Sequence, residues 1–296
     1  MNKPLITVFT PTYNRKHLLP VLYKSLCAQT SRDFVWLIID DGSVDDTESL
    51  VKEWQNEKLI EIRYFYKKNG GMHTAHNAAY RLIETELNVC VDSDDSMPED
   101  AVEKIASFWN SFERKNDVAG ILALDFDINK NQIIGGKLPK DGTVITSEQL
   151  IKQNGDYGDK KFIYRTEIIN SVNEYPEFEG ERLVPLSYKY WLVDRKMPIV
   201  TFNEVVCLVD YQPDGSTNTI ARQYFQSPKG FLASKTEQMI YPRIFKKQVK
   251  STIHYIFFSK LAGEKHYIKK SPKKLLTLVL LPVGIMYYKK MTEKKD

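Results

Sequence analysis

The first 125 residues alternate between short apolar runs, rich in β-branched and aromatic residues, and segments with a helical period. The apolar runs are residues 5–10, 34–40, 61–66, 87–92 and 118–124. The helical patterns are the face formed by Leu18, Leu19, Leu22 and Leu26 and the segments 46–55, 74–84 and 98–109. Strands that alternate with helices predict an α/β fold with a mostly parallel sheet. In such a sheet the ligand crevice lies beyond the carboxyl ends of the strands.

The rest of the chain has a different pattern. Residues 127–143 are rich in turn-forming residues and predict a loop or hairpin, while 161–166 and 199–212 read as later strands. From residue 229 onward the pattern is helical. At the start of the helical segment 98–109, Ser96 and Glu99 have the spacing of a capping box, so we expect the Ser96 side chain to cap this helix.

Charge is distributed unevenly along the chain. The net charge is +4, but residues 229–296 alone contain 16 Lys and Arg against 4 Asp and Glu. The basic excess therefore lies in this last segment, and an acidic partner is expected to bind there. The 3 cysteines lie far apart and fit a reducing compartment. Since the N-terminal residues lack the pattern of a secretory signal, we expect a cytoplasmic protein.

Three carboxylates, Asp92, Asp94 and Asp95, crowd the end of the apolar run 87–92. A single Asp at a strand exit is often only a turn or cap residue. Three together raise one another's pKa and oppose folding unless a cation intervenes. Oxygen ligands favour Mg²⁺ or Mn²⁺, which proteins commonly hold together with the phosphates of a substrate. A metal-diphosphate site is therefore the leading interpretation.

A second acidic group, residues 38–47, also ends a predicted strand. Asp40 or Asp41 could accept hydrogen bonds from a nucleoside, as acidic residues do at strand ends in dinucleotide-binding folds. The alternative is a plain turn, because the dipeptide Asp41-Gly42 is a common turn signal.

Four motifs in order, TPTYNR (10–15), IIDDGSVDDT (38–47), NGGMHTAHNAA (69–79) and VDSDD (91–95), resemble the family-2 glycosyltransferases of the GT-A fold that build bacterial polysaccharides. The resemblance is good over about residues 4–125 and weaker to about 215. It implies a Rossmann-like nucleotide-diphospho-sugar transferase with a mixed, mostly parallel sheet and flanking helices, followed here by a basic helical extension. It also implies a nucleotide-sugar donor, most often a UDP-sugar, and inversion at the anomeric carbon by direct displacement.

The resemblance assigns roles to residues of these motifs. Thr10, Pro11, Tyr13 and Asp41 would surround the base and ribose, with the Tyr13 ring near the uracil. Asp92 and Asp94 would hold Mn²⁺ or Mg²⁺ on the diphosphate, so that Asp92 also belongs to the donor site. Some relatives use the later pair of aspartates, which adds Asp95 to the metal ligands.

The third motif departs slightly from the family pattern, in which a basic residue precedes the Asn. Here that position is His76, and His73 lies three residues earlier on the same face of a helix. One or both histidines, with Asn77, are expected to contact the nucleotide. The alternative is a polar helix start that packs against the preceding loop. A zinc site is disfavoured because no Cys or Glu completes a ligand set at the usual spacing.

The acceptor hydroxyl must lose a proton as it attacks, which calls for a carboxylate or His base. Relatives carry a Gly-Glu-Asp element upstream of an aromatic-rich helix, where this chain has Gly180-Glu181-Arg182. Glu181 is therefore the first candidate base and Glu179 the second, and an acidic surface loop is the alternative. The later Asp214-Gly215 matches a turn on the donor side in the family.

The apolar stretch 275–288 has no charged residue and is flanked by lysines on both sides. It is shorter than the roughly 20 residues that a helix needs to span a bilayer, and Pro282 and Gly284 interrupt it. Insertion into one leaflet, with lysines on anionic head groups, fits better. The alternative is a last helix packed on the domain. Nothing here resembles a nucleic-acid-binding motif.

Together these features predict a nucleotide-sugar-binding half (1–125), an acceptor and base half (126–228) and a basic tail at the membrane surface (229–296). The expected enzyme is a metal-dependent inverting glycosyltransferase, peripheral on the inner face of the membrane, with a saccharide or lipid-linked acceptor in surface polysaccharide synthesis. One alternative is a sugar-phosphate nucleotidyltransferase, although TPTYNRKHLL lacks the Gly-rich loop such enzymes need. Another is an inactive protein that only binds nucleotide sugars.

Overall fold

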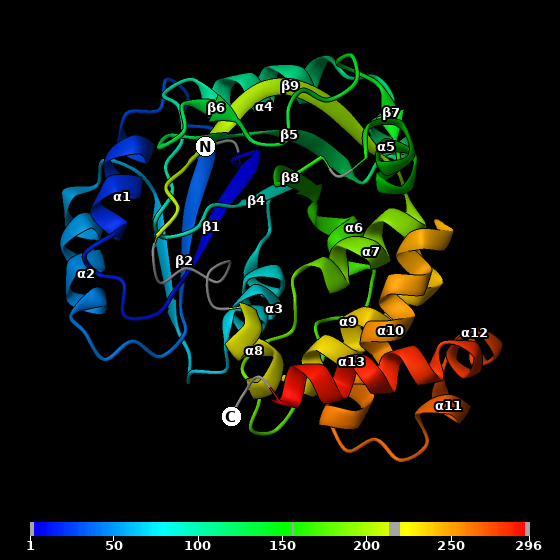
Figure 1. Cartoon of the computed structure of the whole chain (residues 1–296). Coiled ribbons are helices and arrows are strands. Elements are labelled where there is room, and N and C mark those ends of the chain that lie inside the picture. Colours follow the sequence, from blue (N-terminus) through cyan, green and yellow to red (C-terminus); the bar gives the residue numbers. More distant parts are fainter. Residues whose placement is uncertain (1–2, 156, 213–219, 294–296) are drawn as a thin grey trace. The chain divides into compact units, whose positions relative to one another are not determined.

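The computed structural model describes residues 3–155, 157–212 and 220–293 (Figure 1). The chain forms two compact units, Met1–Val172 with Met197–Pro213 and Asn173–Lys196 with Asp214–Asp296. The sequence-based division of the chain at residues 125 and 228 separates expected functions rather than compact units, and it stays a prediction. The turn expected at Asp214-Gly215 lies outside the described residues.

The first unit contains the predicted alternation of strands and helices. Its elements up to residue 111 are β1 (Ile6–Thr12), α1 (Leu19–Cys27), β2 (Phe34–Asp40), α2 (Thr47–Glu57), β3 (Ile62–Tyr66), α3 (Met72–Leu82), β4 (Leu87–Cys90) and α4 (Ala101–Ser111). A short 3₁₀ turn (Lys115–Asp117) precedes β5 (Gly120–Asp127), β6 (Gln132–Ile133), β7 (Val144–Ile145), α5 (Ser147–Asn154), β8 (Lys160–Arg165), α6 (Thr166–Asn170) and β9 (Ile199–Val209).

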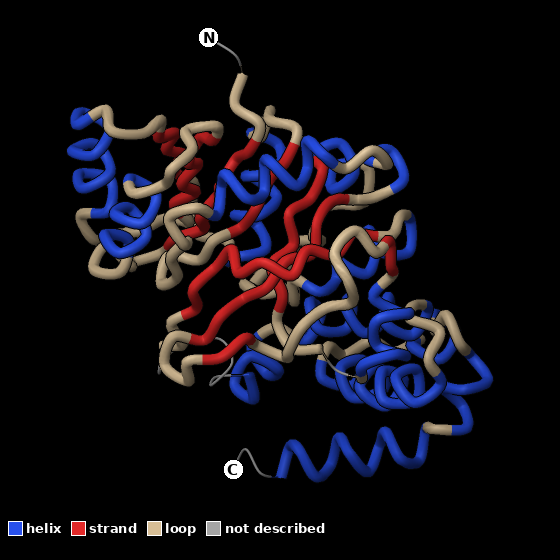
Figure 2. The backbone as a smooth tube through the Cα atoms, turned by 90° about the horizontal axis from the view of Figure 1, so that it is seen from above, coloured by secondary structure: helices blue, strands red, loops and turns tan. Residues whose placement is uncertain are grey.

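The strands form one mixed sheet in the order β3-β2-β1-β4-β8-β5-β9-β7, with β6 paired to β5. Strands β3, β2, β1 and β4 are mutually parallel, whereas β8 runs antiparallel to both β4 and β5. In Figure 2 the strands run through the centre of this unit with helices on both sides. The register pairs Thr12 with Asp40 and Phe9 with Cys90, so the segments after β1, β2 and β4 leave the sheet side by side.

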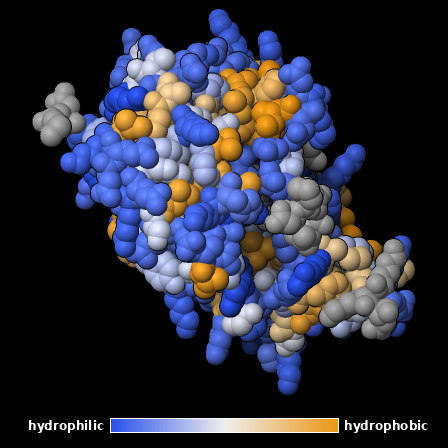
Figure 3. All heavy atoms as spheres, turned by 90° about the vertical axis from the view of Figure 1, so that its left-hand side faces the viewer, coloured by the Kyte–Doolittle hydropathy of each residue, from blue (hydrophilic) through white to orange (hydrophobic). Residues whose placement is uncertain are grey.

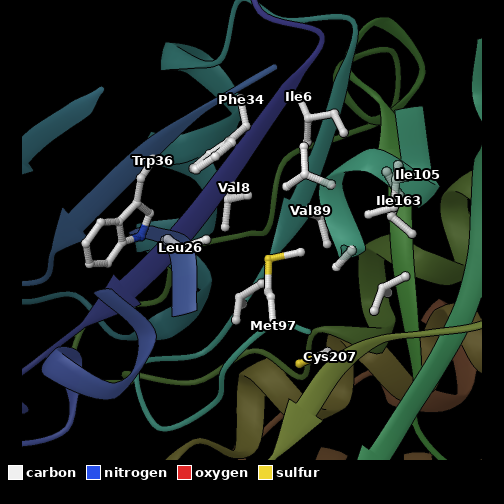
Figure 4. Packing of buried hydrophobic residues seen from close by; sticks show 14 of the residues in the cluster. Ile6, Val8, Leu26, Phe34, Trp36, Val89, Met97, Ile105, Ile163 and Cys207 are labelled. Carbon is white, nitrogen blue, oxygen red and sulfur yellow. The ribbon is translucent and has the colours of Figure 1, made fainter. Parts of the chain in front are cut away.

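The core fills both sides of the central strands. All seven residues of β2 are buried, which explains the unbroken apolar run in its sequence. Trp36 packs among Tyr23 and Trp54, whose rings stack with centroids 4.3 Å apart. Figure 4 shows Trp36 on one side of β1 and Val89 and Ile163 on neighbouring strands. The indole N–H of Trp36 donates to Thr10 Oγ1 at 3.0 Å, so this buried polar group is satisfied.

One helix start differs from the prediction. Helix α4 begins at Ala101 after Asp100, and no side chain caps it, so the capping box expected at Ser96 is wrong. The physical reason is that Ser96 forms two backbone hydrogen bonds with Leu208 of β9, at 3.0 and 2.8 Å. These bonds keep the chain extended at Ser96. A capping box does occur at Thr146 and Gln149, at the start of α5.

The second unit is helical, as expected for the chain after residue 229. Its helices are α7 (Ser187–Lys196), α8 (Ile220–Gln226), α9 (Pro228–Ile240), α10 (Phe245–Leu261), α11 (Tyr267–Lys270), α12 (Lys274–Val279) and α13 (Leu281–Glu293). Phe231, Phe257 and Phe258 form one part of its core, between α9 and α10. Helix α13 lies close to α10 at Gly284, where a Cβ atom would come within 2.7 Å of the Ile256 side chain.

The stretch 275–288 divides between α12 and α13 rather than forming one helix. Within the described ranges, no helix is both long enough and apolar enough to cross a bilayer. One side of α13 packs on α10, while Leu275, Leu278 and Val279 of α12 remain exposed. Elsewhere, the face in Figure 3 is mostly hydrophilic, with apolar side chains gathered in a few small areas.

Candidate active site

The segments after β1 and β2 are joined by hydrogen bonds at the carboxyl end of the sheet. The N–H of Asn14 donates to Ser43 Oγ at 2.9 Å, and the N–H of Val44 donates to Asn14 Oδ1 at 2.8 Å. Asn14 adopts a left-handed conformation with φ of 53°, which Asn tolerates better than most residues. The motif TPTYNR is therefore held against the acidic motif that follows β2.

Asp41 binds the segment that follows β3. Its carboxylate accepts hydrogen bonds from Lys67 Nζ at 2.6 Å and from the N–H groups of Gly70 and Gly71 at 3.0 and 2.7 Å. Gly42 has a φ of 86°, and a Cβ there would lie 2.7 Å from the Asn69 nitrogen. The turn after Asp41 thus requires glycine. Because protein donors already occupy both carboxylate oxygens, the role of Asp41 toward a nucleoside stays a prediction.

The other residues of the first motif divide between core and surface. Thr10 and Pro11 are buried in β1, and the Thr10 hydroxyl accepts the Trp36 bond described above. Tyr13 is 43% exposed, which leaves its ring open to stack on a planar ligand. Asp40 accepts from the Ser43 N–H and the Tyr64 hydroxyl.

The three aspartates after β4 have different surroundings. Asp94 forms an ion pair with Arg15 of the first motif, with Nη1 and Oδ2 2.7 Å apart. Asp95 is buried and accepts from the N–H of Asp210 at 3.3 Å. Asp92 is half-buried, and Cys90 Sγ lies 3.7 Å from its Oδ1. The structure thus places the three carboxylates together at the end of β4 but gives each a different neighbour.

A lysine whose side chain is only 13% exposed lies beside these carboxylates. Lys161 Nζ, on β8, is 3.9 Å from Asp95 Oδ2 and 3.6 Å from Asp125 Oδ1 on β5. Although burial disfavours its charge, the carboxylates of Asp125, Asp95 and Asp92 raise the pKa of Lys161 well above its usual value. Sequence reasoning missed Lys161 and Asp125, because a single charged residue within a strand, here β8 and β5, forms no motif.

We define the acidic cluster as Asp92, Asp94, Asp95 and Asp125. Its four carboxylates carry more formal negative charge than their ion-pair partners Arg15 and Lys161 carry positive charge. Burial raises the pKa of Asp95 to about 7 and also raises that of Asp92, while Lys161 acts in the opposite direction on both. The same cause raises the pKa of Asp125. Two cations form ion pairs with this cluster, Arg15 with Asp94 and Lys161 with Asp95 and Asp125. A divalent cation would balance the remaining charge.

The donor set fits a hard divalent cation. The acidic cluster offers carboxylate oxygens, which Mg²⁺ and Mn²⁺ prefer. Within the described ranges, no group of three His, Cys, Asp or Glu side chains is arranged to hold an ion without further ligands.

The third motif forms α3, in which His73, His76 and Asn77 are all buried. The His76 ring lies edge-on to Phe9 of β1, with centroids 5.1 Å apart. Its Nδ1 is 3.3 Å from the Tyr80 hydroxyl and its Nε2 is 3.7 Å from Cys90 Sγ. His76 therefore packs beneath the strand that leads to the acidic cluster. Contact of these residues with the nucleotide stays a prediction.

The two candidate bases belong to the second unit. Both oxygens of Glu181 accept backbone N–H bonds, from Lys229 at 3.0 Å and Gly230 at 2.9 Å. These groups lie in the first turn of α9, so Glu181 caps that helix from a distant part of the sequence. Glu179 is exposed. The assignment of the base to either residue stays a prediction.

Comparison with known proteins gives three findings. The family model described as Glycosyl transferase family 2 matches residues 7–172. A chondroitin synthase of Escherichia coli is 36% identical over 101 residues, which are 34% of this chain and 14% of the synthase. The chain thus spans far less than two thirds of the length of such curated relatives.

Solved structures match over nearly the whole chain. TarS of Staphylococcus aureus in complex with UDP has a TM-score of 0.63 and 16% identity, covering 98% of this chain and 90% of that one. A mannosyltransferase of Pyrobaculum calidifontis, solved with GDP-Man and Mn²⁺, has a TM-score of 0.57 and 15% identity, covering 99% and 83%. These likenesses confirm the predicted GT-A fold.

Replacing Lys161 should destabilise the protein strongly. Lys161→Met leaves the carboxylates of Asp95 and Asp125 buried without their cation, and we expect the free energy of unfolding in urea to fall by about 3–5 kcal/mol. The control is Lys152→Met, which removes the surface ion pair with Glu148 and should cost less than about 1 kcal/mol. Equal losses in the two variants would contradict this account.

Stability should depend on pH and on Mn²⁺ together. The folded-state pKa of Asp95, about 7, exceeds the ordinary 3.8, so the folded form binds more protons between these values, and metal-free stability falls as pH rises through that window. Mn²⁺ competes with the proton, so it should raise Tm more at about pH 8 than at about pH 5.

Two variants check this expectation by thermal unfolding. Asp95→Asn removes the titrating carboxyl and should flatten the pH dependence. The exposed Asp117→Asn, which removes only a surface pair with Arg114, should leave both the slope and the Mn²⁺ effect intact. A Tm that Mn²⁺ leaves unchanged at every pH, with and without UDP, would exclude a metal site here.

Proposed function

The chain belongs to glycosyl transferase family 2, and we propose that it is a metal-dependent inverting enzyme that uses a UDP-sugar donor. It is a glycosyltransferase that depends on a nucleotide sugar, which agrees with the sequence-based expectation and not with a nucleotidyltransferase. The proposed acceptor is a hydroxyl of a saccharide or lipid-linked saccharide in surface polysaccharide synthesis. The main support is the excess negative charge of the acidic cluster at the carboxyl end of β4.

In the proposed site Asp92 and Asp94 hold Mn²⁺ or Mg²⁺. When bound, such an ion neutralises charge that develops on the leaving diphosphate. Asp94 pairs with Arg15, which places this guanidinium beside the carboxylates that would hold the ion. Arg15 would bind a phosphate oxygen of the donor, for which its planar donor pattern is well suited.

The proposed donor pocket lies between the motifs after β1 and β2. Tyr13 provides an exposed ring for the base, while Asp41 fixes the wall formed by Gly70 and Gly71. The choice of uridine is supported by the solved complexes of TarS with UDP and with UDP-GlcNAc. TarS is named for transfer of N-acetylglucosamine to poly(ribitol-phosphate).

Glu181 is the proposed base, with Glu179 as the second choice. The two N–H bonds from α9 fix the position of the Glu181 carboxylate and leave lone pairs that can accept a hydroxyl proton. A direct displacement needs one base and forms no covalent sugar intermediate. Because Glu181 also caps α9, its substitution has a structural effect that must be separated from a chemical one.

UDP release with Mn²⁺, measured across several UDP-sugars, tests the catalytic proposal. Asp94→Asn should reduce the rate by about 10²–10³-fold, because it weakens stabilisation of the leaving group. Its control is Asp46→Asn, a 79%-exposed carboxylate of the second motif, which should keep wild-type rates. Activity of Asp94→Asn equal to that of the control would refute the metal assignment, and a wild type without activity would favour the inactive binding protein.

The same assay examines the base. Glu181→Gln should abolish transfer while UDP still binds with wild-type affinity, because the substitution does not touch the donor pocket. If Glu181→Gln keeps its activity and Glu179→Gln loses it, the base is Glu179. Circular dichroism monitors the α9 cap in both variants.

We also propose that the basic tail attaches the enzyme to the inner face of the membrane. Leu275, Leu278 and Val279 are 77%, 50% and 66% exposed on α12, and the basic segment around them suits anionic head groups. Deletion of the tail is not a clean test of this proposal. Tyr287, Tyr288 and Met291 pack against the core of the second unit, so their removal would also destabilise the fold.

Point substitutions therefore replace deletion in the membrane test. We expect the wild type to sediment with vesicles of anionic lipid, and the double variant Leu278→Glu/Val279→Glu to remain largely in the supernatant. Leu59→Glu, which changes a 56%-exposed leucine of the first unit, should sediment like the wild type. Equal sedimentation of all three proteins would argue against attachment through α12.

A further inference from the structure

A groove in the second unit is not used by the proposed catalytic site. It lies between α10 and α13 and has a volume of about 520 Å³. Its apolar lining comes from Val249 and Ile253 of α10 and from Val283 and Met286 of α13. Val283 and Met286 are 41% and 65% exposed, so this lining is open to a ligand. The volume lies in the range of small-molecule sites.

The same groove has a cationic rim. Lys246 and Lys250 of α10 and Lys290 of α13 line it, and all three are exposed. No ion pair involves any of the three among the described residues, and no Asp or Glu lines the groove. An apolar floor with unneutralised amines at its edge matches an amphiphile with an anionic head group.

The electrostatics beside the groove agree with this match. Burial, with the nearby charges of Lys235 and Lys250, lowers the pKa of the groove residue His254 to about 4, so its ring is neutral at physiological pH. Burial and the charges of Lys250 and Lys247 lower the pKa of Lys235 to about 8. Positive charges therefore crowd this part of α9 and α10, and a bound anion would relieve their repulsion.

We propose that the groove between α10 and α13 binds one molecule of an anionic phospholipid, with an acyl chain along the apolar floor and the phosphate at the lysine rim. The inference deepens the proposed membrane attachment and rests on it for its biological setting. Attachment through α12 needs only a surface, whereas the groove takes a single lipid. Gly284 permits this arrangement, because it lets α13 approach Ile256 closely while its neighbours Val283 and Met286 face the groove.

Calorimetry with a monomeric lipid tests the groove separately from the bilayer. The full-length protein is titrated with dihexanoyl phosphatidylglycerol below its critical micelle concentration. One molecule per chain should bind. Dihexanoyl phosphatidylcholine, whose head group is neutral overall, and inorganic phosphate, which has no acyl chain, should each bind at least about fivefold more weakly. Equal affinity for either control compound would overturn the proposal.

Matched variants locate the binding. Lys250→Gln should weaken phosphatidylglycerol binding about fivefold, while Lys269→Gln removes an exposed charge outside the groove and should have no effect. Met286→Gln should weaken binding, and Leu275→Gln, an exposed apolar residue outside the groove, should not. All four positions are exposed, so we expect each variant to fold like the wild type, and thermal unfolding checks this. Identical affinities within either pair would refute the site.

The outcome can be separated from those of the earlier proposals. Loss of groove binding with normal vesicle sedimentation would overturn only this inference. Lipid binding by a protein that releases no UDP would leave the groove in place and count against the catalytic proposal. Binding of monomeric lipid by a protein that does not sediment with vesicles would support the groove and contradict only membrane attachment through α12.

Discussion

The buried contact of Lys161 with Asp95 and Asp125 makes the rest of the site possible. A sheet edge with four carboxylates would be hard to fold without an internal cation, because burial and mutual repulsion both favour the neutral acids. Lys161 supplies that cation from β8, the strand that reverses direction between β4 and β5. The antiparallel strand therefore has an electrostatic role in addition to its place in the sheet.

Strand register then determines which motifs meet. Because Thr12 is level with Asp40, the Asn14 turn reaches Ser43, and Asp41 reaches across to the glycines after β3. Each motif thus fixes the backbone of the next one. We expect the proposed donor site to be preformed for this reason, which would reduce the ordering that ligand binding requires.

The fold was largely predictable, because its signals are local. The run 34–40 coincides with β2, and the positions of α1 to α4 follow from apolar periodicity and chain alternation. The misplaced cap at Ser96 and the cap of α9 by Glu181 share one cause: each depends on a partner far along the chain, Leu208 in one case and Gly230 in the other. Lys161 was missed for the same reason, since its significance comes only from strands that pack beside it.

The pairing of Ser96 with Leu208 joins the loop of the acidic cluster to the last strand of the sheet. Asp95 extends this junction, because its carboxylate accepts the N–H of Asp210 immediately after β9. The loop of the acidic cluster is therefore hydrogen-bonded to the chain both within β9 and directly after it. Displacement of Asp95 would therefore strain or break its hydrogen bond to the peptide N–H of residue 210.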